Sequence, residues 1–150
     1  MSDPHVLGPD LAPTPFTADE IRAGCPDGRR LLVRTQLDGL TTYHCDSFAE
    51  GSEEGCALSQ VVTDASGTPV DEPRTSRVTW RELQEHAAFP AAATTVARER
   101  IRLAVGEREC VRYDVERESG SSRFWFAVDQ PGMPLRYESR GAVVEVLSIE

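Results

Sequence analysis

The stretch RFWFAVDQPGMPLRYE, residues 123–138, decides the fold prediction. Apolar side chains at even positions precede the turn dipeptide Pro131-Gly132, and apolar side chains at odd positions follow it. A hairpin centred on that dipeptide places both sets on one face of a sheet, because side chains alternate along a strand. The set consists of Phe124, Phe126, Val128, Leu135 and Tyr137.

The same parity test extends the sheet in both directions along the chain. A three-residue loop at 106–108 joins odd-numbered apolar residues at 101–105 to those at 111–115. An even loop, either Ser119-Gly120 or four residues around it, leads to the strand that starts near 124, and Ser139 to Gly141 join the strand at 135–138 to 142–149. Four hairpins then share one apolar face, which predicts an antiparallel meander. The opposite face is expected to be wet and carries Arg100, Arg102, Arg112, Asp114, Glu116, Arg136 and Glu138.

The final strand, AVVEVLSI at 142–149, does not alternate cleanly. Glu145 shares a face with apolar Val143 and Leu147, while Val144 and Val146 occupy the other face. Either the strand is buried on both sides or Glu145 points inward, and the pattern leaves both readings open.

The first half of the chain predicts more strands and two short helices. Alternating segments lie at 29–37, 40–45 and 56–62. Capping boxes at Thr17/Glu20 and Thr79/Glu82 predict helices over 18–24 and from 80 to about 88. Residues 1–15 carry four prolines and no hydrophobic period, which predicts a flexible N-terminal arm. Residues 16–150 are expected to form a single α+β domain of about eight strands and two short helices.

Composition excludes several classes of function. The net charge of -9 disfavours nucleic-acid binding, and no apolar run is long enough for a membrane span. All 16 basic residues are arginines, so lysine Schiff-base and phosphate-loop chemistry is absent. The first 16 residues lack the basic start and apolar run of a signal peptide, so a cytoplasmic location is expected if Met1 is the native start.

Four cysteines and three histidines leave few catalytic patterns. Cys45 and Cys56 flank a ten-residue loop and would form a redox pair or disulfide if they faced each other across a hairpin; two inert thiols are the alternative. The neighbouring His44 and the loop acids match no zinc spacing, so no metal is expected. His44 and Cys45 are predicted to point to opposite faces of a strand.

A family resemblance rests on GERECVRYDVERESGSSRFWFAVDQPGMPLRYES, residues 106–139, and extends to 149. Its marks are Gly106, Cys110 with Tyr113, the aromatic strand 124–127, and a turn from Gly132 to Pro134 before Glu138. The segment resembles the DUF3108 or TapB-like proteins, relatives of the LolA/LppX lipoprotein-carrier fold. That resemblance implies a strongly curved half-barrel with helices on its concave side, where carrier relatives hold acyl chains. It implies no catalytic residue and no cofactor.

The sequence therefore predicts a non-enzymatic binding module that holds a small apolar ligand or a protein partner on the concave face. The predicted lining residues are Ile101, Leu103, Tyr113, Phe124, Phe126 and Tyr137. The alternative is a small cyclase-like or isomerase-like enzyme with Glu145 or His86 as the acid/base. A third reading is an interaction protein with an exposed apolar patch around Trp125.

Overall fold

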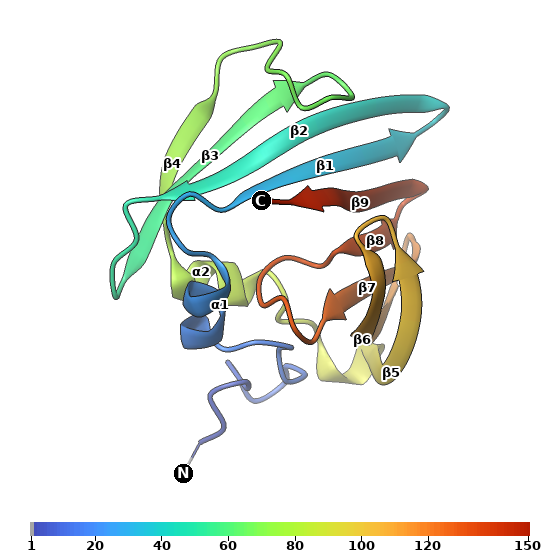
Figure 1. Cartoon of the computed structure of the whole chain (residues 1–150). Coiled ribbons are helices and arrows are strands. Elements are labelled where there is room, and N and C mark those ends of the chain that lie inside the picture. Colours follow the sequence, from blue (N-terminus) through green and yellow to red (C-terminus); the bar gives the residue numbers. More distant parts are fainter. Residues whose placement is uncertain (1) are drawn as a thin grey trace.

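The computed structural model describes residues 2–150, and within that range nine strands form one unclosed antiparallel sheet (Figure 1). The elements in chain order are α1 (Ala18–Gly24), β1 (Arg30–Leu37), β2 (Leu40–Ala49), β3 (Gly55–Thr63), β4 (Arg74–Thr79), α2 (Trp80–Glu85), the 3-10 turn η1 (Ala91–Ala93), β5 (Thr94–Leu103), β6 (Gly106–Arg117), β7 (Gly120–Ala127), β8 (Arg136–Ser139) and β9 (Ala142–Ile149). The predicted α+β half-barrel with two short helices is confirmed, with nine strands in place of about eight.

Two meanders meet at the centre of the sheet. The strand order is β4-β3-β2-β1-β9-β8-β7-β6-β5, so β1 pairs with β9 and the first and last strands of the chain lie side by side (Figure 1). Strands β4 and β5 form the two open edges. The segment that carries α2 and η1 connects these edges and crosses one face of the sheet. We call the face covered by the helices the inner face and the opposite one the outer face.

Both helices begin where the capping boxes predict. Thr17 Oγ1 accepts a hydrogen bond from Glu20 N, and Thr79 Oγ1 accepts one from Glu82 N. In return, the backbone N–H of each threonine donates to the carboxylate of that glutamate. Such caps satisfy backbone donors that a short helix otherwise leaves unpaired. The two helices pack on each other and bury Ile21 and Trp80 toward the sheet.

Two of the predicted hairpins, β6–β7 and β7–β8, keep the expected faces. The β8–β9 turn contains two residues, Arg140 and Gly141, and not the predicted three from Ser139, so Tyr137 shares a face with Val144 and not with Val143. Tyr113 pairs with Phe124, Phe124 with Tyr137, and Tyr137 with Val144, so these side chains form one row on the inner face. The β7–β8 connection spans the Pro131-Gly132 turn, as predicted. Gly24 at the end of α1 packs so closely on this connection that a Cβ atom there would collide with the Pro131 carbonyl.

The β5–β6 hairpin has a different register from the predicted one. Leu103 pairs with Gly106, so the turn contains two residues, Ala104 and Val105, and not three. A one-residue change in loop length reverses the face of the whole strand. Ile101 pairs with Arg108 and therefore points to the outer face, away from Tyr113.

Strand β9 is buried on both sides, which decides between the two readings of its pattern. Val144, Glu145 and Val146 are all buried. Val146 pairs with Val33 on the inner face, and Glu145 pairs with Arg34 on the outer face. Glu145 therefore points away from the helices.

The segment before α1, predicted as a flexible arm, packs against the body of the protein. Ala12 N donates to Phe89 O at 2.8 Å, and Ala91 N donates to Asp10 O at 2.9 Å. Thr14 is 3% exposed, and Tyr113 donates its hydroxyl proton to Pro13 O. These contacts seat residues 10–14 beside η1, in contrast to the sequence expectation.

Candidate functional site

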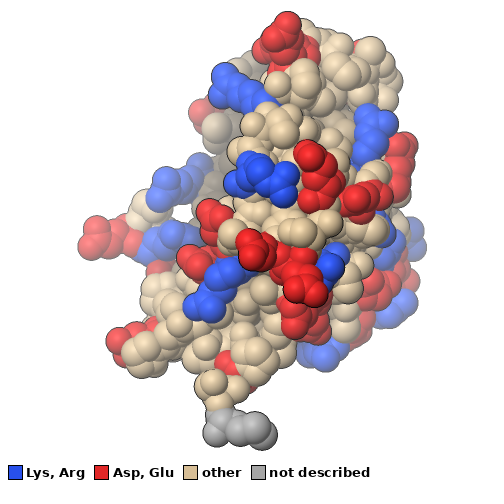
Figure 2. Space-filling model, turned by 90° about the vertical axis from the view of Figure 1, so that its left-hand side faces the viewer, with Lys and Arg blue, Asp and Glu red and all other residues tan. Residues whose placement is uncertain are grey.

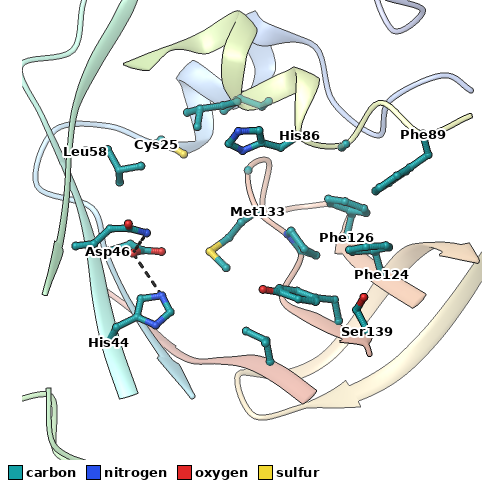
Figure 3. Close-up of a pocket in the computed structure, with 18 of the residues that line it drawn as sticks. Cys25, His44, Asp46, Leu58, His86, Phe89, Phe124, Phe126, Met133 and Ser139 are labelled. Atoms are coloured by element: carbon teal, nitrogen blue, oxygen red, sulfur yellow. Dashed lines mark hydrogen bonds and ion pairs between the residues drawn. The ribbon is translucent and has the colours of Figure 1, made fainter. Parts of the chain in front are cut away.

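A cavity of about 660 Å³ lies between the inner face of the sheet and the two helices (Figure 3). The helices contribute Ile21, Leu83 and Ala87, and the sheet contributes residues from both meanders. The full lining is Ile21, Cys25, His44, Asp46, Phe48, Leu58, Gln60, Leu83, His86, Ala87, Phe89, Arg117, Phe124, Phe126, Gly132, Met133, Pro134, Tyr137, Ser139, Arg140 and Val144. The curvature of the sheet leaves this space because two short helices cannot fill the whole concavity.

One wall of the cavity is aromatic. Phe124 stacks on Phe89 with ring centroids 4.8 Å apart and on Tyr137 with centroids 5.6 Å apart. The ring centroids of Phe126 and Phe124 are 6.4 Å apart, and the Met133 side chain extends into the middle of the cavity (Figure 3). Offset stacks of this kind form a rigid apolar surface with little conformational freedom left to lose.

The facing wall carries a polar cluster of His44, Asp46 and Gln60. Gln60 Nε2 donates to Asp46 Oδ1 at 3.0 Å, and His44 Nε2 lies 3.5 Å from the same oxygen. Strand alternation places His44 and Asp46 on the inner face with Phe48, while Cys45 points outward as predicted. Figure 3 shows His44 and Asp46 across the cavity from Phe124.

A second polar group lies where the β6–β7 and β8–β9 turns meet. Ser139 Oγ and Ser122 Oγ are 2.7 Å apart, and Arg117 Nε donates to Ser122 Oγ at 3.1 Å. Arg117 and Arg140 are exposed, so their charges stay hydrated at this end of the cavity.

The six predicted lining residues divide into two groups. Phe124, Phe126 and Tyr137 line the cavity. Tyr113 is 3% exposed and packs in the core against Phe89 and Phe126. Leu103 and Ile101 lie on the outer face because the β5–β6 turn is one residue shorter than predicted. The prediction that these two residues line the cavity is therefore wrong. Whether the three cavity residues bind a ligand stays a prediction.

Sequence reasoning missed much of the lining that the first meander supplies. Asp46, Phe48, Leu58 and Gln60 alternate along β2 and β3, so a parity test on those strands could have grouped them with His44. The signal was weak because these positions mix polar and apolar residues. Met133 had no periodic signal, since it lies in the connection between β7 and β8.

The outer face carries an ion-pair network around Trp125 and is not fully wet. Trp125 is 7% exposed and donates its Nε1 proton to Glu99 Oε2 at 2.9 Å. The guanidinium groups of Arg123 and Arg136 lie 5.9 and 5.8 Å from its ring centroid. The expectation of an exposed apolar patch around Trp125 is therefore wrong, because charged side chains cover the indole.

Glu145 belongs to this outer network. Its Oε1 accepts from Arg136 Nη1 at 2.7 Å, and its Oε2 accepts from the backbone N of Ala104 at 2.6 Å. Arg34 Nη2 lies 3.8 Å from Oε1. Glu145 is therefore paired on the face opposite the cavity and is placed where it cannot act on a molecule inside it. His86, the other acid/base candidate, caps the end of α2 and lines the cavity.

The register separates Cys45 from Cys56. Cys45 pairs with Val61, whereas Cys56 pairs with Val78 at the far end of β3, and the two thiols point to opposite faces. Cys25, Cys45, Cys56 and Cys110 are free and buried. Burial raises the pKa of Cys25 to about 11 and also raises the pKa values of Cys56 and Cys110, which lowers their thiolate fraction at neutral pH.

Tyrosine hydroxyls near the cavity are held in the neutral form. Burial raises the pKa of Tyr113 to about 12. Burial also raises the pKa of Tyr137, and the negative charge of Asp46 adds to that rise. Across residues 2–150, no group of three or more His, Cys, Asp or Glu side chains is arranged to hold a metal ion. Over the same range, no helix is long and apolar enough to cross a bilayer.

Charges are mixed on the side of the molecule that carries the β2–β3 turn and the helices. Figure 2 shows acidic side chains gathered near the middle of this face with basic ones interspersed around them. No continuous basic surface is visible in that view, which agrees with the net charge of -9.

Comparison with solved structures supports the fold. The crystal structure of MucB in complex with MucA(peri) matches with a TM-score of 0.55 at 12% identity, covering 89% of this chain and 53% of that chain. The Pseudomonas aeruginosa MucA/MucB complex matches with a TM-score of 0.56 at 13% identity, covering 88% and 54%. This chain shares the fold of these two structures and spans about half the length of the two chains matched in them.

A further structural match is weaker, and no match was found at the level of sequence. A putative exported protein with a YmcC-like fold from Bacteroides fragilis NCTC 9343 aligns at 8% identity with a TM-score of 0.44, covering 84% of this chain and 97% of that one. No family model and no curated protein matches this sequence. Membership of the DUF3108 or TapB-like proteins therefore stays a prediction.

Proposed function

We propose that this chain is a non-enzymatic binding module that holds one small apolar molecule in the cavity under its inner face. The observation that supports this proposal is the cavity itself, because its volume of about 660 Å³ is in the usual range for small-molecule sites. Its aromatic wall is a large apolar surface, and an apolar ligand that packs on it removes that surface from water.

The arrangement of polar groups favours binding over catalysis. Asp46 Oδ1 accepts from Gln60 and lies beside His44, which leaves this carboxylate as an acceptor for a bound molecule, and Glu145 is engaged by Arg136 on the other face. A general acid or base must reach the bound molecule with a proton to exchange. His86 is the remaining candidate of the enzymatic alternative, and no second catalytic group was predicted to accompany it.

Native mass spectrometry of protein purified from its own host tests the proposal. A mass excess that disappears on denaturation is expected, because unfolding removes the apolar wall that holds the bound molecule. Leu58→Trp is expected to remove that excess by filling the cavity from β3. Leu40→Trp is the matched control, because Leu40 is 72% exposed on β2 and does not line the cavity. A bare mass for the wild-type protein, or equal loss in both variants, would contradict the proposal.

A protein partner is the second candidate, and the fold comparison favours it. The two MucB structures are complexes with MucA, and this chain shares their fold over most of its length. In this reading the inner face receives a segment of a partner protein. Capture of one protein from host extract by the wild type and by Leu40→Trp, but not by Leu58→Trp, is the expected result. Equal capture by all three proteins would place the partner outside the cavity.

A further inference from the structure

The polar cluster on the first meander gives the cavity a chemically distinct end. We propose that the bound molecule is amphipathic, with a hydrogen-bond-donating head, preferably an amine, seated on Asp46 and an apolar body along the aromatic wall. This inference rests on the proposed binding function and deepens it by naming the class of ligand.

The first observation is the free capacity of the Asp46 carboxylate. The side chain is 10% exposed and lines the cavity from the middle of β2. Gln60 and His44 both approach Oδ1, and within residues 2–150 no hydrogen-bond donor contacts Oδ2. A carboxylate offers about four acceptor sites, so this one has room for a further donor. Oδ2 is reached by solvent from the cavity, so a ligand that displaces this solvent is favoured when it supplies a donor in its place.

The second observation is the separation of polar and apolar walls. Figure 3 shows Asp46 and His44 on one side, Phe124 and Phe126 on the other, and Met133 between them. A molecule that spans the cavity therefore meets the carboxylate at one end and stacked rings at the other. A purely apolar ligand would bury Asp46 without pairing it.

The third observation concerns the sign of the head group. Asp46 brings negative charge into the space, and that charge contributes to the raised pKa of Tyr137 on the facing wall. A cationic head gains a charge-assisted hydrogen bond there, whereas a carboxylate head is repelled. An anionic head would instead be drawn to Arg117 and Arg140 at the turn end, where exposure to water weakens the attraction.

Calorimetric titration with three ligands of equal chain length tests the inference. Decylamine, decanol and decanoate are titrated at pH 7, below their aggregation concentrations, into the wild-type protein. We expect decylamine to bind about tenfold or more tighter than decanol, because a hydrogen bond to a charged group outweighs a neutral one. Decanoate is expected to bind weakest. Equal affinities, or decanoate as the tightest ligand, would overturn the inference.

Two isosteric variants separate the local carboxylate from the overall charge. Asp46→Asn is expected to bring decylamine to within about threefold of decanol, because the charged acceptor is lost. Asp38→Asn removes the same charge from the exposed β1–β2 turn, where its φ of 51° suits asparagine, and is expected to keep the amine preference. An equal effect of both variants would assign the preference to net charge and overturn the inference.

The wild-type titrations also separate this inference from the proposed function. If all three ligands bind with similar affinity, an apolar site exists but Asp46 does not select the head group. If none binds, both proposals fail for single-chain ligands. The ranking in the wild type needs no variant, so a poorly folded Asp46→Asn protein would not leave the inference untested.

Discussion

At the scale of single residues, partners decide the role of each polar side chain. Trp125 belongs to an aromatic strand whose neighbours Phe124 and Phe126 face the cavity, yet alternation turns it outward between two arginines. Glu145 shows the same principle, because its two carboxylate oxygens are used by an arginine and a backbone N–H on the outer face. A buried carboxylate with such partners stabilises the fold and has no free acceptor directed at the cavity.

Glu145→Gln is expected to lower the free energy of unfolding by about 1–3 kcal/mol. The change removes the charge that pairs with Arg136 and Arg34, and these arginines are about 30% exposed, which limits the loss through hydration. Guanidinium unfolding monitored by circular dichroism measures the shift.

Glu138→Gln is the matched control for that variant. Glu138 Oε2 accepts from the same Arg136, but its side chain is 41% exposed. A loss below about 1 kcal/mol is expected for such an exposed pair. Similar losses in the two variants would show that burial of Glu145 does not matter.

At the scale of elements, connections set which face a strand presents. The two-residue β5–β6 turn reverses β5 relative to the prediction, and it also brings Ala104 N to Glu145 on β9. The segment before α1 is likewise defined by its contacts. Gln84 on α2 is 3% exposed, accepts from Ala18 N, and donates to Pro4 O and Thr14 Oγ1. One buried amide thus joins both helices to the N-terminal segment.

Gln84→Met is expected to destabilise the protein by about 1–3 kcal/mol and to loosen residues 4–14. Methionine has a similar volume but leaves the Ala18 N–H and the Pro4 carbonyl without that partner. Hydrogen–deuterium exchange should show faster exchange at Ala12 and Thr14, whose amides donate to Phe89 O and His5 O. Gln36→Met, at an exposed position on β1, is expected to change neither measurement. Unchanged protection in Gln84→Met would show that the segment is held by other contacts.

At the scale of the whole molecule, the open sheet leaves two edges that need protection. Strand β5 carries Arg98, Arg100 and Arg102 at exposed positions along its edge. Charged edge residues oppose pairing with a second chain, which otherwise extends a sheet through free backbone groups. The charges along β5 therefore protect that edge of the sheet from pairing with a second chain.

Replacing Arg100 and Arg102 by valine is expected to cause self-association. The two changes increase the net negative charge, and that increase by itself favours solubility. Self-association would therefore be caused by the apolar edge that the valines create. Light scattering against protein concentration measures the effect. The control is Gln36→Val with Thr41→Val, a cross-strand pair on β1 and β2, both of which have neighbours on each side. Association of the control to the same extent would mean that surface hydrophobicity, and not the edge, is responsible.

The sequence by itself determined the local structure of this protein. Capping boxes at Thr17 and Thr79 located both helix starts, and alternation around Pro131-Gly132 placed Phe124 and Tyr137 on one face. These signals are local, because a cap or a hairpin is specified by residues that lie close together in the chain. Half of the predicted cavity lining was found for the same reason.

The tertiary structure alone decided the order of the sheet and the composition of the cavity. The β1–β9 pairing joins residues more than a hundred positions apart and brings the wall with His44 and Asp46 opposite the wall with Phe124. No periodicity within either meander reports which strands of the two will meet, since that pairing depends on the joint burial of both apolar faces. The β5–β6 turn likewise makes a contact that its own sequence does not report, because Ala104 N donates to Glu145 on β9.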